Sequence, residues 1–288
     1  MQNIVIQSNE YYESTKLIIE EWKKMWLNMF YAKNSDFEIK ANWSNLEIYF
    51  QWKEFTKKNF DAVYFRTTLK YRDSYMLIAK YAKDNWIYVL DYNWLIQYGE
   101  KLYNLDFMRK SELKIIPTYS SMDWKIPGKL DFDFPVIYKP AIWKQWIWVE
   151  KIETFEELKN KLKNKKESYL IQKFIKNSWD IRVIIIWKKI IWAMKRISAW
   201  KDFRNNISLW GTWKKYEIWD DLRKKIKSFI EKSQVQYDFY WLDLIEDEEK
   251  KWEYYFMEYD RSIQFNWFSS TTWINVAREL LEYIIKKI

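Results

Sequence analysis

Glycine, the residue that forms most tight turns, is nearly absent from this chain, whose 288 residues include 3 glycines and 21 tryptophans. Glycine averages about 7% of ordinary domains, or roughly 20 residues in a chain of this length. The tryptophans and glycines together come close to that number, and many tryptophans stand where turns are expected. We therefore interpret many tryptophans as glycine positions, which would follow if UGA codons that specify glycine in the source were read as tryptophan.

The segment that follows Lys139 and Pro140 is the clearest case for this interpretation. Trp143, Trp146 and Trp148 follow a strand-like run at a spacing that neither an amphipathic helix nor a strand requires. Glycines there would let backbone N–H groups approach a phosphate closely. The alternative is a naturally tryptophan-rich protein that binds a membrane interface or a carbohydrate, and UGG codons at all three positions would favour it.

The absence of both cysteine and histidine excludes several kinds of site. The chain has no residues for disulfides, thiolate or imidazole metal sites, Ser-His triads or histidine general bases. Any metal ion must be held by oxygen, which favours Mg²⁺. We expect a cytoplasmic protein without a membrane span, because cysteine is absent and no run of about 18 uncharged apolar residues occurs.

The formal net charge of +9 is spread over lysines in many predicted helices. A scattered lysine surface is usually a solvated face, and attraction to nucleic acid or to an acidic protein is the functional alternative. Because the lysines are not gathered in one segment, we do not expect a nucleic-acid partner.

Strands and helices alternate over the first hundred residues. The helix predicted at 11–25 places Leu17, Ile18 and Met25 on one face. Such alternation is typical of a parallel α/β sheet. The predicted strands are 3–7, 27–32, 46–50, 62–66 and 87–91, and the predicted helices are 11–25 and 74–83.

The remaining two thirds of the chain mix hairpins with helices, so we expect an α/β fold that becomes α+β in its C-terminal part. Thr154 is placed to cap one helix, and Trp187 to form the turn of one hairpin. The predicted helices are 98–113, 154–163, 220–232 and 275–288, the single strands are 134–138 and 169–174, and the hairpins are 181–196 and 239–259.

A series of short polar motifs runs through this later part of the chain. In chain order they are Gly99-Glu100-Lys101, Tyr138-Lys139-Pro140, the tryptophan segment, Asp180-Ile181-Arg182, Asp202-Phe203-Arg204-Asn205-Asn206, Leu242-Asp243, Glu258-Tyr259-Asp260 and Thr271-Thr272-Trp273. This order resembles the ATP-grasp superfamily, and most closely its RimK-type ligases. The resemblance implies an ATP-grasp fold with an N-terminal α/β pre-ATP-grasp domain at 1–100, a central subdomain at 101–176 and a C-terminal subdomain at 177–288.

The resemblance also implies a nucleotide site in the central subdomain. Lys101 and Lys139 would contact the phosphates of ATP, and the backbone of the loop with Trp143, Trp146 and Trp148 would close over them. The adenine would meet a hinge strand, in which Lys173 stands where the family usually has glutamate. The hinge residues are Gln172, Lys173, Phe174 and Ile175.

Two further groups of residues would carry the chemistry. Arg182, Arg204 and Asn206 would contact the transferred phosphate and the substrate carboxylate; for each Asp-x-Arg motif the alternative is a surface ion pair with Asp180 or Asp202. The second group holds Mg²⁺ or Mn²⁺. Glu258 and Asp260 share a strand face because they are two residues apart, and Asp243 on the paired strand would complete the oxygen ligands; the alternative is a charged edge strand.

The activity implied by the resemblance is an ATP-dependent carboxylate–amine ligase. ATP would convert a carboxylate to an acyl phosphate, and an amine would then form an amide bond, as in the addition of glutamate to a protein or peptide. The partners would be ATP, a carboxylate and an amine, while the oligomeric state, homo-oligomers included, stays open. If the loop tryptophans are genuine, we expect instead a catalytically impaired nucleotide-binding protein, because three indoles would obstruct the phosphate pocket.

Overall fold

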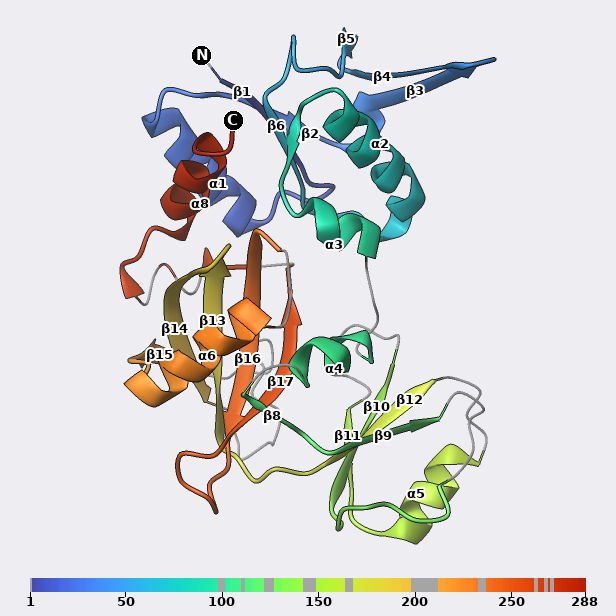
Figure 1. The fold of residues 1–288 in the computed structure, drawn as a ribbon, viewed down its shortest axis with the longest axis vertical. Coiled ribbons are helices and arrows are strands. Elements are labelled where there is room, and N and C mark those ends of the chain that lie inside the picture. The colour runs from blue at the N-terminus through green and yellow to red at the C-terminus, as the bar shows by residue number, and fades with distance from the viewer. Residues whose placement is uncertain are drawn as a thin grey trace.

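The computed structural model describes residues 2–97, 102–109, 112–121, 127–141, 149–163, 168–197, 212–232, 237–261, 264–266, 269 and 272–288. The N-terminal sheet lies at one end of the molecule, a six-stranded sheet lies in the middle, and a four-stranded antiparallel sheet lies at the other end (Figure 1). None of the described helices is long and apolar enough to cross a membrane.

The N-terminal sheet is parallel, as the alternation of strands and helices predicts. Its order is β2 (Asn28–Ala32), β1 (Asn3–Gln7), β6 (Ala62–Phe65) and β7 (Tyr88–Val89). The central strand β1 is apolar on both faces, as is typical of a parallel sheet that is covered on both sides. Ile4 and Ile6 pack with α1 (Glu13–Lys24), whereas Val5 packs in the cluster of α2 (Arg72–Asp84).

A small antiparallel sheet extends from this layer (Figure 1). It comprises β3 (Phe37–Asn42), β4 (Asn45–Phe50) and β5 (Lys53–Glu54), and only β4 was expected from the sequence. Phe37, Ile39 and Ala41 alternate with polar residues along β3, which is the period-two pattern of a strand, although most of this strand is exposed. The short helices near this layer are η1 (Asn34–Asp36), η2 (Leu69–Tyr71) and α3 (Tyr92–Gln97).

The four-stranded antiparallel sheet has the order β11 (Glu150–Ile152), β10 (Val136–Pro140), β12 (Tyr169–Lys173) and β9 (Thr118–Ser121). Helix α5 (Phe155–Leu162) packs on it through Leu158 and Leu162. Thr154 caps this helix, since its hydroxyl oxygen accepts a hydrogen bond from the Glu157 backbone N–H at 3.2 Å. The predicted helix, its cap and both single strands are therefore confirmed.

The six-stranded sheet has the order β15 (Thr212–Tyr216), β14 (Lys189–Ile197), β13 (Trp179–Ile186), β16 (Phe239–Glu246), β17 (Tyr254–Asp260) and β8 (Lys114–Ile115). Both predicted hairpins, β13–β14 and β16–β17, are present. Strand β8 lies outside the 177–288 range yet extends this sheet as a parallel partner of β17. The helices that accompany this sheet in the chain are α4 (Tyr103–Met108), α6 (Asp220–Lys232) and α8 (Val276–Ile285).

The last helix, α8, returns to the N-terminal layer, where it lies beside α1 (Figure 1). Arg278 of α8 lies 3.4 Å from the Glu21 carboxylate of α1. A second link joins the N-terminal sheet to β16: the Asp91 carboxylate accepts hydrogen bonds from the backbone N–H groups of Asp238 at 2.7 Å and Phe239 at 3.0 Å. These contacts join the N-terminal sheet to the six-stranded sheet.

Tryptophan dominates the left-handed backbone conformations. Nine described non-glycine residues have φ between 45° and 70°, and seven of them are tryptophan. A residue with a Cβ atom pays about 1–2 kcal/mol in this region, whereas glycine adopts it freely. Most of these indoles are well exposed, so burial does not offset that strain. The seven are Trp26, Trp43, Trp52, Trp86, Trp187, Trp252 and Trp273, and their conformation supports the interpretation of these positions as glycine.

Trp86 allows this interpretation to be tested by stability. It follows the end of α2, where its N–H donates to Lys83 O and the N–H of Ile87 donates to Ala82 O, the pattern of a glycine-type helix stop. Its φ is 62° and its side chain is 84% exposed. We expect Trp86→Gly to raise the free energy of unfolding in urea by about 1 kcal/mol, because it removes the strained Cβ.

Two control variants separate the Cβ atom from the indole. Trp86→Ala removes the exposed ring but keeps the Cβ, so the free energy of unfolding should stay near that of the parent protein. Trp22→Gly, at a buried position inside α1, should lower it by several kcal/mol. Equal effects of glycine and alanine at position 86 would show that the backbone conformation is not the cause.

Candidate active site

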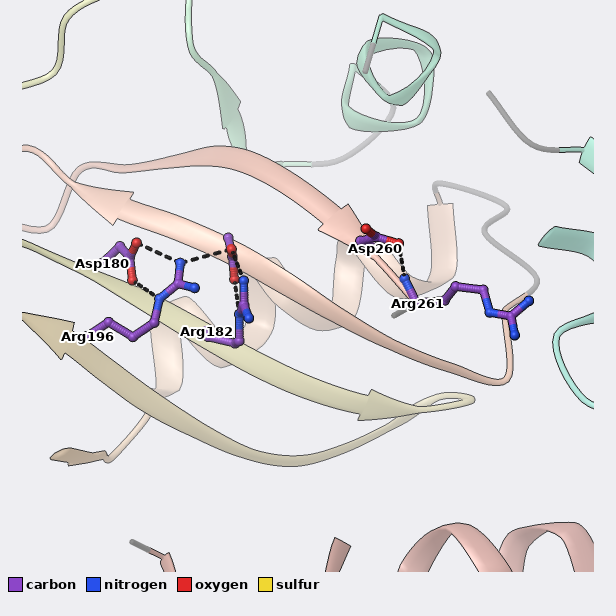
Figure 2. A network of polar contacts seen from close by, with 6 residues as sticks. Asp180, Arg182, Arg196, Asp260 and Arg261 are labelled. Carbon is purple, nitrogen blue, oxygen red and sulfur yellow. Dashed lines mark hydrogen bonds and ion pairs between the residues drawn. The ribbon is translucent and has the colours of Figure 1, made fainter. Parts of the chain in front are cut away.

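Four charged side chains form a buried network in the six-stranded sheet (Figure 2). Asp180 and Arg182 share a face of β13 because they are two residues apart. Arg182 stands opposite Asp243 on β16, and Asp180 stands opposite Arg196 on β14. The sheet register therefore brings the four side chains together from three adjacent strands.

Both ion pairs of the network are bidentate. Arg182 donates to the Asp243 carboxylate at 2.8 and 2.7 Å, and Arg196 donates to Asp180 at 2.6 and 2.7 Å. Arg196 also reaches Asp243 at 2.9 Å and so links the two pairs. This geometry matches the planar fork of the guanidinium group to both carboxylates.

Burial and ion pairing act against each other in this network. Burial raises the pKa of Asp180 to about 6, although Arg196 opposes the rise. Burial also acts to raise the pKa of Asp243, but Arg182 and Arg196 hold that pKa below its ordinary value. Arg182 is the network's most accessible member, with 16% of its side chain exposed and its guanidinium 3.9 Å from the centre of the Trp241 ring.

The pairing differs from the one considered from the sequence. The surface alternative paired Arg182 with Asp180, whereas the structure pairs Arg182 with Asp243 in the interior. The sequence analysis gave no role to Arg196, which holds Asp180. A charged residue inside the apolar hairpin predicted at 181–196 was the signal that could have identified it, because a buried charge requires a partner.

The three carboxylates predicted to bind metal lie on the paired strands β16 and β17. Asp243 stands opposite Glu258, and Asp260 stands opposite Trp241. Among the described residues, no three acidic side chains lie close enough together to hold a metal ion. Asp243 is occupied by two guanidinium groups, so it fits a metal site poorly in this arrangement, whereas the partly buried Glu258 and Asp260 offer the oxygen atoms that Mg²⁺ prefers.

A small pocket between the four-stranded and the six-stranded sheets brings together the predicted nucleotide residues of the described chain. Lys139 of β10 lines it with the predicted hinge residues Gln172, Lys173, Phe174 and Ile175. Asp180, Ile245 and Met257 line it from the six-stranded sheet. Its volume is about 50 Å³, well below the roughly 300–1,000 Å³ of pockets that enclose a drug-sized ligand, so a nucleotide requires the walls to move apart.

The other predicted site residues lie outside the described part of the chain. They are Lys101, Trp143, Trp146, Trp148, Arg204 and Asn206. Their roles stay predictions.

The ion network of Asp180, Arg182, Arg196 and Asp243 should contribute strongly to the free energy of unfolding. We expect Arg196→Met to lower the free energy of unfolding by about 3–5 kcal/mol, because it leaves Asp180 buried without its guanidinium partner. Lys225→Met is the matched control: Lys225 lies 2.6 Å from Asp221 in an exposed pair on α6, and its loss should cost less than about 0.5 kcal/mol. Urea unfolding at neutral pH measures both, and similar small costs would contradict a structural role for the network.

Comparison with known proteins identifies the family. Residues 108–284 match the family model for the RimK-like ATP-grasp domain, which covers more than half of the chain. A sequence comparison with curated proteins found no match.

Solved structures of similar fold extend over the whole chain. The ATP-grasp ligase PsnB, solved with a minimal precursor, has a TM-score of 0.73 at 14% identity and covers 100% of this chain and 99% of its own. The macrocyclase MdnC from Microcystis aeruginosa, bound to the precursor peptide MdnA, has a TM-score of 0.70 at 15% identity, covering 99% of this chain and 100% of its own. A RiPP-associated ATP-grasp ligase from Chryseobacterium gregarium, in complex with ADP and a leader and core peptide, has a TM-score of 0.72 at 15% identity, covering 100% and 98%.

At 14–15% identity, the similarity to solved structures shows the fold alone. The match to the family model shows the class of enzyme. The predicted α/β ATP-grasp fold and the predicted class, an ATP-dependent ligase, are both confirmed. The chain belongs to the RimK-like ATP-grasp family.

Proposed function

We propose that this ligase uses ATP to activate a side-chain carboxylate of a peptide and joins it to an amine through an amide bond. The observation that carries this proposal is the pocket that Lys139 and the hinge strand share with Asp180 and Met257. It places a buried ammonium and the hinge strand against the strands that carry Arg182 and Glu258. A nucleotide bound there lies between the cationic and the acidic residues that phosphoryl transfer requires.

The chain's own residues act by binding and by neutralising charge. Lys139 lines the pocket, so its ammonium can contact a phosphate bound there and neutralise part of its charge. Arg182 presents a guanidinium at the accessible end of the buried network. Glu258 and Asp260 would hold Mg²⁺, which when bound neutralises charge on the phosphates of ATP.

The reaction consists of two transfers. The carboxylate oxygen attacks the γ-phosphorus of ATP, the bond to the bridging oxygen breaks, and ADP leaves an acyl phosphate behind. The amine nitrogen then attacks the acyl carbon, inorganic phosphate departs, and the nitrogen loses a proton. No covalent bond to the protein is needed, which suits a chain without cysteine or histidine.

The solved ligases of the same fold support a peptide as the carboxylate substrate, because their structures include complexes with a minimal precursor or with precursor peptides. An amine within the same peptide would give a ring, whereas a free amino acid such as glutamate would give an added residue. An enzyme that uses the amine of the same peptide is a macrocyclase, and an enzyme that uses a free amino acid extends the peptide by a residue.

The predicted loop with Trp143, Trp146 and Trp148 raises a second candidate function, that of a catalytically impaired nucleotide-binding protein. With tryptophan at 143, 146 and 148 the backbone amides could not approach a triphosphate closely, and we expect weak ATP binding from the chain as written. The seven left-handed tryptophans elsewhere favour glycine at turn positions and hence an active enzyme.

Phosphate release with Mg²⁺-ATP tests the proposal on a protein with glycine at positions 143, 146 and 148. We expect release that depends on a peptide containing Asp or Glu and on an amine, with the amide product identified by mass spectrometry. Lys139→Met should lower the rate about 100-fold or more, because a phosphate loses its buried cation.

Two controls test whether a loss of phosphate release is specific to Lys139 and to the loop positions. Lys159→Met, in the neighbouring helix α5, should leave the rate unchanged, because Lys159 pairs with Glu156 at the surface. The protein with all three tryptophans should release little phosphate. Equal turnover by the tryptophan and glycine proteins would contradict the glycine interpretation of the loop, and release without any carboxylate would contradict the ligase proposal.

A further inference from the structure

The end of strand β17 is anchored to the N-terminal layer by Arg261, the residue that follows Asp260. The Arg261 side chain is 1% exposed and extends away from the Asp260 carboxylate (Figure 2). Its guanidinium lies 4.4 Å from the centre of the Trp94 ring and donates to the backbone carbonyl of Phe65, the last residue of β6. A cation that follows the six-stranded sheet is thus buried in the N-terminal layer.

Asp91 provides the counter-charge for Arg261. Its Oδ2 atom lies 3.6 Å from Arg261 Nε, and its side chain is completely buried. Burial raises the pKa of Asp91 to about 7, and the positive charge of Arg261 is the strongest influence that opposes this rise. Because a buried charge requires a partner, Asp91 depends on Arg261 for its negative charge.

Asp91 also holds the start of the neighbouring strand β16. Its Oδ1 atom accepts hydrogen bonds from the backbone N–H groups of Asp238 and Phe239. Strands β16 and β17 are antiparallel, with Asp260 opposite Trp241, so the start of β16 and the end of β17 lie side by side. One carboxylate therefore ties both strand ends to the N-terminal layer.

The Asp260 carboxylate is connected directly to the anchored residue. Its Oδ1 atom accepts a hydrogen bond from the Arg261 backbone N–H at 2.6 Å. Strand β17 ends at Asp260, so the position of that N–H depends on the anchor of the Arg261 side chain and not on the sheet ladder. Groups that orient a metal-binding carboxylate contribute about 10–100-fold to metal affinity.

The chain stays against the N-terminal layer beyond Arg261. Gln264 accepts a hydrogen bond from the Ser14 hydroxyl of α1 at 2.5 Å. Phe265 is fully buried in the apolar cluster that it shares with β1. Arg261 is the charged member of this contact and the one next to Asp260, so it has the greatest influence on that carboxylate.

We propose that Arg261 is a positioning residue for the Mg²⁺ site, because it anchors the end of β17 and thereby fixes the Asp260 carboxylate. The inference rests on the proposed function for the role of Asp260 as a metal ligand. It adds that the ion pair of Arg261 with Asp91 in the N-terminal layer controls how well the enzyme binds Mg²⁺ beside the nucleotide.

Calorimetric titration with ADP tests the proposal without turnover. The protein carries glycine at positions 143, 146 and 148, and the affinity ratio is the affinity for ADP with Mg²⁺ divided by the affinity without Mg²⁺. We expect Arg261→Met to lower this ratio about tenfold and to leave the affinity for metal-free ADP unchanged. In an Asp260→Ala background, Arg261→Met should have no further effect, because the carboxylate that it positions is gone.

Tyr283→Phe is the matched control for the contact between the two layers. The Tyr283 hydroxyl donates to Asp238 at 2.5 Å, so its loss weakens the packing at the start of β16 and leaves the end of β17 untouched. The affinity ratio should stay that of the parent protein. An equal fall of the ratio in Tyr283→Phe, or an equal loss of ADP affinity with and without Mg²⁺ in Arg261→Met, would assign Arg261 a merely structural role.

Asp91→Asn is a milder second variant, and it carries the test if thermal unfolding shows that Arg261→Met does not fold. Asparagine tolerates the left-handed backbone of Asp91, whose φ is 58°, and keeps an oxygen for the N–H groups of Asp238 and Phe239. It removes the charge that faces Arg261, so the affinity ratio should again fall. An unchanged ratio in Asp91→Asn would contradict the proposal.

Asp260→Ala distinguishes failure of this inference from failure of the proposed function. A lower affinity ratio in Asp260→Ala, together with an unchanged ratio in Arg261→Met, would overturn the positioning role alone. An unchanged ratio in Asp260→Ala would overturn the metal site of the proposed function and this inference with it.

Discussion

The ion network of Asp180, Arg182, Arg196 and Asp243 sets the geometry on which the other candidate groups depend. Buried charges are tolerated only when they are paired with good geometry. Here the pairing requires that β13, β14 and β16 keep one register, because a slip of one residue would move each charge to the opposite face of its strand. Strand β17 pairs with β16 in turn, so that Glu258 lies opposite Asp243 and Asp260 lies opposite Trp241.

Strand β17 then borders two cavities of different size. Toward its middle it lines the small pocket that β12 also lines, and at its end Asp260 lines a cavity of about 1140 Å³ at the carboxyl ends of the N-terminal parallel strands. The hydrogen bonds of Asp91 to the start of β16 hold the N-terminal sheet against the six-stranded sheet, and the hydrogen bond from the Tyr283 hydroxyl to Asp238 holds α8 to the same place. The position of the six-stranded sheet relative to the N-terminal sheet is thus built into the fold.

Periodic patterns made much of this fold predictable. The parallel strands, α5 with its Thr154 cap, and the hairpin that turns at Trp187 follow from local signals. Strand β3 was missed although Phe37, Ile39 and Ala41 alternate with polar residues along it. The pairing of β8 with β17 was missed because a strand of two residues is too short to show a pattern in the sequence. In the site, the sequence identified Arg182 and Asp243 but not their mutual pairing, which depends on register between strands 61 residues apart.

The central claim is that ATP activates a peptide carboxylate. Oxygen tracing measures this step directly: the glycine-loop protein is incubated with Mg²⁺-ATP, an amine and a peptide whose side-chain carboxylates carry ¹⁸O. The account predicts that the inorganic phosphate released with each amide bond contains an ¹⁸O atom from the carboxylate, as mass spectrometry of the phosphate would show. Amide formation with unlabelled phosphate would contradict an acyl phosphate and with it the proposed mechanism.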